Sequence, residues 1–379
     1  MKVRALANNL VQRGHQVTVL TADLGLRKRG CSGPEFERCK WGRCSQQDGV
    51  EVIYLSTSWR YRSLTVNPRV LGFCVSSLKG FDIVHFYGLY DLLGPSVSHF
   101  CRAQEIPYVI EPMGMYRPID RGFRLKRIWH RTVGRTYLRS AARIVATSEM
   151  EYQELLEEGV PTEKLLLRYN GVDAPSNATL PARGAFRAQW GIPPKEPLIL
   201  FLSRLIPRKG ADILIEAFAE ACPESGRLVI AGPEGESGYR AYLEKRARDC
   251  GIAARVHFTG PVYDDAKIAL LADADLFALP SRYENFANVA AEAMASGVPV
   301  IITDTCGIRS LVEGQAGLVI PREMQALAEA VRKLIRDKTA YARFREGARR
   351  VVERLDWNLL AGQMEICYEQ VLAQSHATH

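Results

Sequence analysis

The second half of the chain alternates short apolar runs with segments of helical periodicity. The apolar runs lie at 198–204, 227–232, 256–260, 275–280, 298–304 and 318–320. Strands that are apolar along nearly their whole length are typical of parallel sheets that are covered on both faces. We therefore predict a doubly wound α/β domain in this half, with one long helix near 286–296.

The first half repeats the scheme, with strand-like runs at 15–22, 50–56, 81–88, 107–114 and 142–148. Gly, Pro and Asn cluster at 168–181, so we place the boundary between two domains close to Asn170. The prediction is a pair of Rossmann-like domains, 1–169 and 170–355, that face a cleft. A last helical pattern at 356–379 follows a complete second domain, and we expect it to cross back to the first.

The start of the chain departs from this scheme. An amphipathic helix, with Val3, Leu6 and Leu10 on one stripe, leads directly to the strand at 15–22. Doubly wound domains normally begin with a strand and a Gly-rich turn. We therefore expect that the N-terminal domain lacks its first strand and that Met1 is an internal methionine of a longer parent protein.

Composition excludes several classes of protein. With 379 residues, 47% of them hydrophobic and 24% charged, the chain is expected to be globular and is long enough for two domains. No apolar run reaches eighteen residues, and the polar start does not resemble a signal peptide, so we expect a cytoplasmic protein. Nine scattered cysteines predict reduced thiols, and the segment 25–44, with Cys31, Cys39 and Cys44, is expected to be a flexible basic loop without metal.

The net charge of +8 is concentrated in the first half. Residues 1–168 contain 25 Lys and Arg against 16 Asp and Glu, whereas the remainder is close to neutral. Such a field predicts an anionic partner. Within 116–143, a cationic stripe of helical spacing suggests a peripheral site on the inner face of the cytoplasmic membrane, and a solvated helix face is the alternative. The stripe comprises Arg124, Arg127, Arg131, Arg135 and Arg139. Nucleic acid is not expected, because no binding module accompanies the charge.

The segment 281–301 carries two acids eight residues apart, Glu284 and Glu292. We predict a helix that starts near Asn285, so Glu284 precedes this helix and Glu292 lies on it. A rise of 1.5 Å per residue separates them by about 12 Å along the axis, which suits the two ends of a nucleotide sugar. The backbone N–H groups of Phe286, Ala287, Asn288 and Val289 would then face a phosphate. In the alternative interpretation neither acid binds a ligand: Glu284 only complements the helix dipole, and Glu292 is a solvated surface charge.

Two cations follow the strand at 198–204. Arg204 and Lys209 lie on the strand-to-helix loop, at the edge where α/β proteins bind ligands, and can neutralise a departing diphosphate. The alternative is that both are ordinary solvated charges of a loop. The turn AGPEG at 231–235 adds a third loop at the same edge and offers Glu234 as a polar contact.

Together these motifs resemble glycosyltransferase family 4, densely from about 198 to 320 and again at Trp357. The resemblance implies the GT-B fold, no metal and no cofactor besides a nucleotide-diphosphate sugar as donor substrate. It further implies that Arg204 and Lys209 contact the diphosphate, that Glu284 and the backbone at 286–288 contact donor sugar and phosphate, and that Glu292 contacts the ribose.

The resemblance is thinner in the first half. FDIVHFYG (81–88) is similar to the family's strand that ends in a histidine, His85, with Tyr87 where many relatives carry a second one. PYVIEPMGM (107–115) is similar to the segment near the acceptor, which implies an acceptor-side role for Gly114 and Met115. A core histidine bonded to the backbone is the alternative for His85.

We therefore expect a metal-independent, retaining hexosyltransferase that transfers a sugar from a nucleotide diphosphate to a hydroxyl of a glycan or a lipid-linked acceptor, in polysaccharide or glycolipid assembly. Arg204, Lys209, Glu284 and His85 are the expected catalytic residues, with His85 as a positioning group. A nucleotide-sugar epimerase is the first alternative. The second is a membrane-surface binding protein derived from a transferase.

Overall fold

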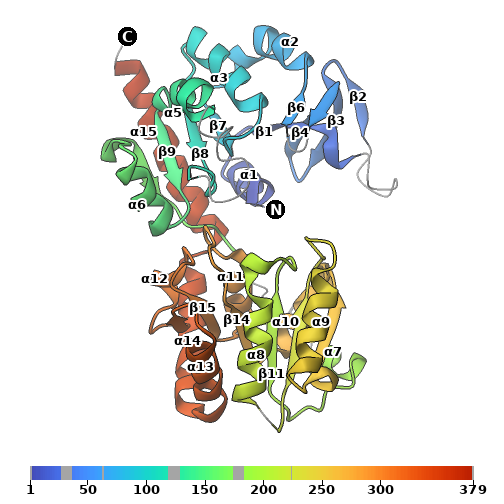
Figure 1. The fold of residues 1–379 in the computed structure, drawn as a ribbon. Helices are drawn as coiled ribbons and strands as arrows, with labels where there is room; N and C mark the ends of the chain where they lie inside the picture. Colours follow the sequence, from blue (N-terminus) through green and yellow to red (C-terminus); the bar gives the residue numbers. More distant parts are fainter. Residues whose placement is uncertain are drawn as a thin grey trace. The chain divides into compact units, whose positions relative to one another are not determined.

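The computed structural model divides the chain into two compact units (Figure 1). Unit 1 comprises Met1–Tyr169 and Trp357–His379, and unit 2 comprises Asn170–Asp356. The structure describes residues 2–26, 36–61, 64–117, 129–173, 183–222 and 224–377.

Unit 2 is built on one parallel sheet of six strands in the order β13-β12-β11-β14-β15-β16. Its central strands are almost free of solvent contact, which explains their unbroken apolar sequences. The strands are β11 (Leu198–Leu202), β12 (Arg227–Ala231), β13 (Val256–Gly260), β14 (Leu276–Leu279), β15 (Val300–Thr303) and β16 (Gly317–Ile320). The parallel doubly wound sheet predicted from the sequence is confirmed.

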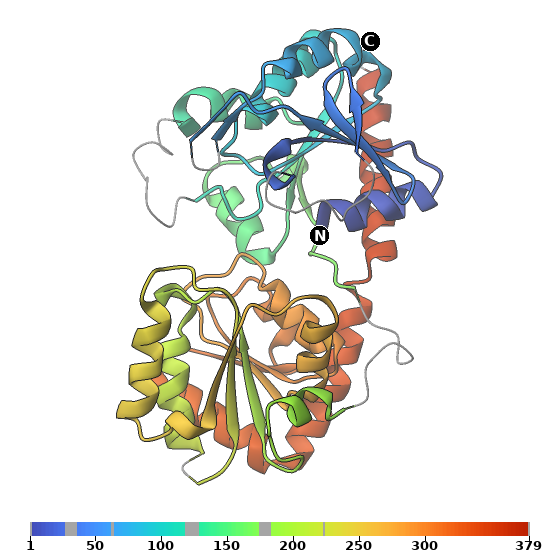
Figure 2. The same cartoon turned by 90° about the vertical axis from the view of Figure 1, so that its right-hand side faces the viewer.

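Helices cover both faces of this sheet (Figure 2). Helix α8 packs on α9 and α13, α7 packs on α10, and α11 packs on α14. The helices of unit 2 are α7 (Ala185–Gln189), α8 (Ala211–Ala221), α9 (Tyr239–Asp249), α10 (Asp264–Asp273), α11 (Asn288–Ala295), α12 (Arg309–Val312), α13 (Met324–Arg336) and α14 (Lys338–Glu353). Because α11 starts at Asn288, the predicted start near Asn285 was three residues too early.

Unit 1 contains two four-stranded sheets in place of the single sheet that the sequence predicts. One is parallel in the order β10-β9-β8-β7, and the other has the order β1-β4-β3-β2. In the second sheet β1 and β4 are parallel, whereas β3 runs antiparallel to both β4 and β2. The strands are β1 (Thr18–Ala22), β2 (Glu37–Cys39), β3 (Gly42–Gln47), β4 (Val50–Leu55), β7 (Val84–Tyr87), β8 (Tyr108–Glu111), β9 (Arg143–Ala146) and β10 (Leu165–Leu167), with a separate hairpin of β5 (Trp59–Tyr61) and β6 (Leu64–Val66).

The last helix belongs to unit 1, although it follows unit 2 in the sequence. Helix α15 lies along β8, β9 and α1 and buries Met364 and Val371 in a cluster with Leu6 and Val145 (Figure 1). Arg13 donates a hydrogen bond to Glu365 at 2.7 Å and adds a polar tie. The helices of unit 1 are α1 (Lys2–Gln12), α2 (Arg69–Ser76), α3 (Leu93–Ala103), α5 (Arg135–Arg139), α6 (Glu149–Glu157) and α15 (Trp357–Ala377).

Two predictions about the segment 25–44 are wrong. From residue 36 onward this segment forms the β2–β3 hairpin rather than a flexible loop, while residues 27–35 lie outside the described residues. Cys39 and Cys44 form a disulfide in this hairpin with 5.9 Å between their Cα atoms, so these two thiols are not reduced. In the antiparallel pairing Cys39 lies opposite Gly42 and Cys44 opposite Glu37, so the disulfide joins the two strands diagonally. The spacing of the two cysteines alone carries no such signal. Cys31 lies outside the described residues.

Much of the predicted cationic stripe lies outside the described residues. Arg124 and Arg127 lie outside the described residues, as does the side chain of Arg131. The described end contains a π-helical turn, His130–Gly134, followed by α5. Arg135 and Arg139 are exposed on α5, whereas Tyr137 and Leu138 are buried in unit 1.

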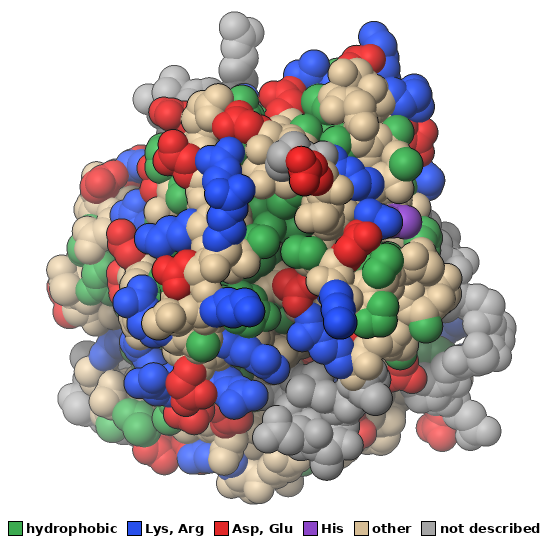
Figure 3. Space-filling model, turned by 90° about the horizontal axis from the view of Figure 1, so that it is seen from below, with side chains coloured by type: hydrophobic (Ala, Val, Ile, Leu, Met, Phe, Trp, Pro, Cys, Tyr) green, Lys and Arg blue, Asp and Glu red, His purple; other side chains and the backbone are tan. Residues whose placement is uncertain are grey.

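On the face drawn in Figure 3, basic, acidic and apolar side chains of the described residues are interspersed, and no single kind covers that face. None of the helices in the described parts of the chain combines the length and the apolar character that crossing a bilayer requires.

Candidate functional site

The sheet of unit 2 has a topological switch point between β11 and β14. From β11 the chain continues outward through β12 and β13, and from β14 it continues in the opposite direction through β15 and β16. Open α/β sheets bind ligands outside the carboxyl ends of the strands at such a point. The loops after β11 and β14 carry Arg204, Lys209 and Glu284, so the topology brings together residues that are far apart in the sequence.

Close backbone contact holds these two loops together. Arg282 N donates to Arg208 O at 2.8 Å, and Ser281 Oγ donates to the same carbonyl at 3.3 Å. Gly210 has φ +76°, and a Cβ there would lie 2.2 Å from Pro280 O. Only glycine satisfies both the left-handed backbone and this contact.

Lys209 and Glu284 form an ion pair across the two loops. Their side chains are only 9% and 14% exposed, so both charges are largely removed from water. Glu284 is fixed further because its N–H donates to Thr305 O at 3.1 Å, while its carbonyl accepts from Gly307 N at 2.9 Å. Arg204 is exposed and has no carboxylate partner among the residues described. Lys209 is thus neutralised by Glu284, whereas Arg204 is available to bind an anion.

Helix α11 begins beside these loops with an unusual backbone. Ala287 precedes it with φ 71° and ψ 60°, a left-handed conformation that is costly for a residue with a Cβ. The helical hydrogen bonds start with the N–H groups of Ala290 and Ala291, which both donate to Ala287 O. The N–H groups of Asn288 and Val289 therefore precede the first bonded turn and can donate to an anion. Phe286 and Ala287 are themselves buried.

Glu292, on the second turn of α11, pairs with a lysine that the sequence analysis did not single out. Lys267 Nζ on α10 lies 2.9 Å from Glu292 Oε1, and both side chains are about one-fifth to one-quarter exposed. A carboxylate has lone pairs for more than one donor, so Glu292 can accept further hydrogen bonds while it remains paired. No sequence spacing relates Lys267 to Glu292, because they lie on different helices.

Glu234 has a structural contact of its own. Its Oε1 accepts a hydrogen bond at 3.1 Å from Arg240 N, in the first turn of α9. A backbone hydrogen bond joins the loops after β11 and β12, in which Leu205 N donates to Pro233 O at 2.9 Å. Glu234 is exposed at the same sheet edge as Arg204, and its carboxylate already serves a helix N-terminus.

In unit 1, His85 on β7 points into a buried aromatic cluster. Its Nδ1 lies 2.7 Å from Tyr368 Oη on α15, and its ring stacks on Tyr87 with 4.3 Å between centroids. Burial, assisted by Arg168, lowers the pKa of His85 from 6.5 to about 3. The imidazole is therefore neutral near neutral pH, and it is too weak a base to remove a hydroxyl proton efficiently.

An ion pair next to His85 escaped the sequence analysis. Glu111, the last residue of β8, and Arg168, directly after β10, pair while only 0% and 1% exposed. Three polar atoms around this pair are buried and have no hydrogen-bond partner within the described part of the chain: Glu111 Oε1, Arg168 Nε and His85 Nε2. Burial also lowers the pKa of nearby Lys2 to about 8. A charged residue that ends each of two apolar runs was the available signal, and a buried pair of this kind is costly to break.

The expected acceptor-side loop follows Glu111. Met113 and Gly114 both have positive φ, 59° and 73°, and the Gly114 N–H donates to Glu151 Oε1. Glu151 is fully buried and also accepts from Thr147 N at 2.8 Å. Met115 is 37% exposed at the end of this loop. The structure thus presents Gly114 and Met115 at the carboxyl edge of the parallel sheet of unit 1.

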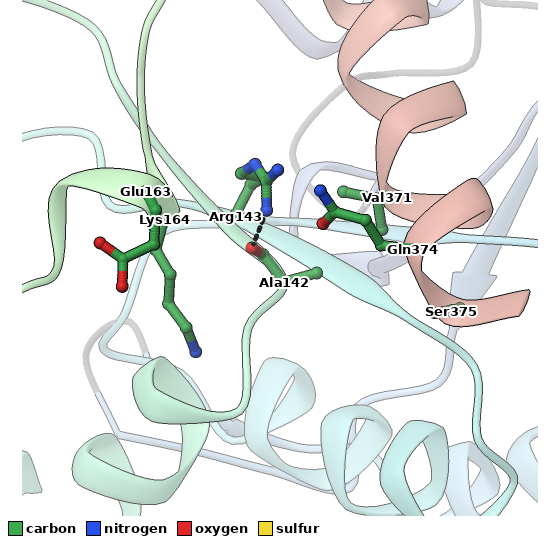
Figure 4. A pocket seen from close by; sticks show the side chains of 7 residues that line it. All are labelled: Ala142, Arg143, Glu163, Lys164, Val371, Gln374 and Ser375. Carbon is green, nitrogen blue, oxygen red and sulfur yellow. Dashed lines mark hydrogen bonds between the residues drawn. The ribbon is translucent and has the colours of Figure 1, made fainter. Parts of the chain in front are cut away.

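A separate hollow of about 340 Å³ lies between the start of β9 and the end of α15 (Figure 4). Arg143 and Lys164 line it, but Lys164 Nζ donates to the carbonyls of Arg139 and Ala141 at 2.6 and 3.1 Å. No predicted site residue lines this hollow. Within the described parts of the chain, no group of three His, Cys, Asp or Glu side chains is arranged to hold a metal.

Comparison with protein families matches both halves of the chain. Residues 2–171 match the family described as glycosyl transferase 4-like domain, and residues 182–351 match glycosyl transferases group 1. The D-inositol 3-phosphate glycosyltransferase of Xylanimonas cellulosilytica is 34% identical over 60% of this chain and 56% of its own length. The GDP-mannose:cellobiosyl-diphosphopolyprenol alpha-mannosyltransferase of Xanthomonas campestris is 28% identical over 79% of this chain and 75% of its own. The chain thus spans little more than half the length of the first relative.

Solved structures share the fold. Sucrose-phosphate synthase of Thermosynechococcus elongatus superposes with a TM-score of 0.76 and 24% identity, over 98% of this chain and 93% of that one. HepE of Anabaena, solved in complex with UDP-glucose, superposes with a TM-score of 0.67 and 23% identity, over 88% of this chain and 87% of its own. These structures and this chain share two Rossmann-like domains of the GT-B type.

Proposed function

Because this chain belongs to the family 4-like glycosyltransferases with the GT-B fold, we propose that it transfers a hexose from a nucleotide-diphosphate donor to a hydroxyl acceptor with retention of anomeric configuration. The single observation that carries this proposal is the set of charges at the switch point of unit 2. Arg204 and Lys209 provide cations, α11 offers N–H groups, and Glu284 and Glu292 are hydrogen-bond acceptors.

Each part of a nucleotide sugar has a partner of suitable chemistry in this set. The leaving diphosphate accepts hydrogen bonds from Arg204, Lys209 and the N-terminus of α11, which stabilise charge that grows in the transition state. Glu284 accepts from hexose hydroxyls and Glu292 from the ribose. Lys209 must share its ammonium between Glu284 and the diphosphate, so donor binding is coupled to the position of Glu284.

In the proposed reaction the bond between the anomeric carbon and the diphosphate oxygen breaks, and the acceptor oxygen bonds to the same face of that carbon. The acceptor proton passes to a phosphate oxygen of the leaving nucleoside diphosphate. No protein nucleophile or base is needed, which agrees with the neutral, buried His85. We propose that His85 positions the loop that follows β7. Gly114 and Met115 are proposed to contact the acceptor.

The relatives support the substrate classes. HepE binds UDP-glucose, and the Xanthomonas enzyme is named for a GDP-mannose donor and a diphosphopolyprenol acceptor. We propose a nucleotide sugar as donor and a glycan or lipid-linked acceptor, in polysaccharide or glycolipid assembly. A lipid-linked acceptor and the basic excess of residues 1–168 support a peripheral location at the cytoplasmic membrane surface.

The proposal is tested by incubating the protein with a panel of nucleotide sugars and lipid-linked or oligosaccharide acceptors, and by detecting the glycosylated product. We expect activity to survive EDTA, because the cations of the protein take the place of a metal. The R204A/K209A variant should slow transfer by orders of magnitude. Activity that chelation abolishes and Mg²⁺ or Mn²⁺ restores would contradict the electrostatic assignment.

A further inference from the structure

Unit 1 exposes a group of large apolar side chains that neither its core nor the candidate site uses. Trp59 and Tyr61 on β5 are 54% and 53% exposed, and Leu71 and Val75 on α2 are 53% and 68% exposed. Leu71 and Val75 are four residues apart on one helix and so form a single ridge. Large apolar side chains that gather at the surface mark an interaction site more often than isolated ones do.

Backbone pairing places Trp59 beside the end of the strand that leads into α2. Trp59 lies opposite Val66, and Tyr61 lies opposite Leu64, in the β5–β6 hairpin. Strand β6 ends three residues before α2, and Val70 N donates to Asn67 O at 3.0 Å in the tight connection. The Trp59 and Tyr61 rings stack with 6.3 Å between centroids. We call Trp59, Tyr61, Leu71 and Val75 the apolar surface.

The stretch of sequence that carries the apolar surface contains only positive charges. Residues 52–81 contain four Lys and Arg and no Asp or Glu, the acids nearest in sequence being Glu51 and Asp82. Arg69 is the first residue of α2, and Lys79 lies in the short 3-10 turn Leu78–Gly80 that follows the helix. From the neighbouring hairpin, Trp41 packs edge to face on Phe73 of α2, and Lys40 lies 4.5 Å from the Trp41 ring. The β2–β3 hairpin thus brings a further cation, Lys40, to the neighbourhood of α2.

We propose that the apolar surface docks unit 1 on an anionic phospholipid bilayer. Trp and Tyr favour the headgroup level, aliphatic residues enter the acyl boundary, and Lys40, Arg69 and Lys79 pair with lipid phosphates. Charge complementarity favours this occupant over a neutral or basic protein partner. The inference rests on the proposed peripheral location and assigns it to a surface other than the stripe within 116–143.

The test measures binding to vesicles of phosphatidylglycerol and phosphatidylcholine in equal parts by co-sedimentation. The L71S/V75S variant should bind about tenfold more weakly or worse, because it removes two apolar side chains from the contact. The matched control is L359S/I366S, which removes two side chains that are 50% and 56% exposed on α15. That helix carries Glu365 and Glu369 near them, so we expect unchanged binding.

Charge variants provide an independent arm. The R69S/K79S variant should weaken binding to the vesicles and reduce the salt dependence of that binding. If circular dichroism shows that L71S/V75S is unfolded, R69S/K79S tests the docking surface in its place. Binding equal to the wild type in either variant contradicts the docking surface, as does equal loss in the α15 control or equal binding to phosphatidylcholine alone. If only R135S/R139S abolishes binding, this surface is wrong while the proposed location stands. If the wild type binds no vesicle, both are wrong.

Discussion

At the scale of single residues, the candidate donor site contains two ion pairs and one exposed arginine, Arg204. Lys209 is paired with Glu284, and Lys267 with Glu292, on four different elements of unit 2. The sequence predicts three of these four residues, because motif spacing marks them. It does not predict Lys267, since only the packing of α10 beside α11 brings its amine to Glu292.

The two acids should have separable effects. Replacing Glu292 with Ala should weaken nucleoside-diphosphate binding by about 1–3 kcal/mol, the usual cost of losing a charged hydrogen-bond partner. Glu284→Ala should lower sugar transfer more than it weakens binding of the bare nucleotide. Calorimetric titration and a transfer assay on both variants measure this, and equal effects on nucleotide binding would contradict the division of roles.

His85 should not titrate near neutral pH. Its pKa of about 3 lies below the ordinary 6.5, so between these values the unfolded chain binds a proton that the folded chain does not. Unfolding free energy should therefore fall as pH drops below 6.5, by up to about 1.4 kcal/mol per pH unit. Replacing His85 with Gln should remove this contribution while leaving the pH profile of transfer above pH 5 unchanged.

Ring proton chemical shifts measured by NMR, with His85→Gln to assign the signal, provide the direct check. A His85 signal that titrates between pH 6 and 8, or a transfer profile that loses its acid limb in the Gln variant, would show that the imidazole is available as a base.

At the scale of elements, the parallel strands of unit 2 were predictable because each is an unbroken apolar run. Hairpins β2–β3 and β5–β6 were not, because strands of three residues such as β2 and β5 carry too short a pattern and are largely exposed. The start of α11 was misplaced because Ala287 adopts a left-handed backbone that alanine rarely does, and apolar periodicity does not report this.

Gly210 should be more sensitive than other glycines with the same backbone. Gly210 and Gly238 both precede helices, with φ +76° and +80°, but only at Gly210 does a Cβ meet backbone, at 2.2 Å from Pro280 O. Gly238→Ala should cost about 1 kcal/mol of stability from left-handed strain alone. Gly210→Ala should cost clearly more and also weaken nucleotide binding, because it separates the loops after β11 and β14. Equal losses of stability in thermal unfolding, with nucleotide affinity retained, would show that the close contact is unimportant.

At the scale of the whole molecule, the chain builds unit 1 from its two ends. The sequence predicts a final helix free of the second domain, and the structure packs α15 on α1, β8 and β9. Its partners could not be read from periodicity, because α15 is apolar on more than one side. The pairing of Glu111 with Arg168 could not be predicted either. A charge at the end of each of two apolar runs marks the two residues, but only the aligned strands of the sheet bring them together.

Met364 provides a test of this arrangement. Its side chain is fully buried among residues of α1, β8 and β9, so Met364→Ala should destabilise unit 1 by about 2–5 kcal/mol. In differential scanning calorimetry, the transition of unit 1 should move to lower temperature and that of unit 2 should not. A shift of the unit 2 transition alone would place α15 with the wrong unit.

The proposed function requires that the switch point of unit 2 binds a nucleoside diphosphate through protein cations. Calorimetric titration of the protein with UDP and with GDP, in EDTA, tests it most directly. The wild type should bind at least one of them, and Lys209→Met should weaken this binding about tenfold or more, since a charged hydrogen bond to the diphosphate is lost. Failure of the wild type to bind either nucleotide, or binding that Lys209→Met leaves unchanged, would contradict it.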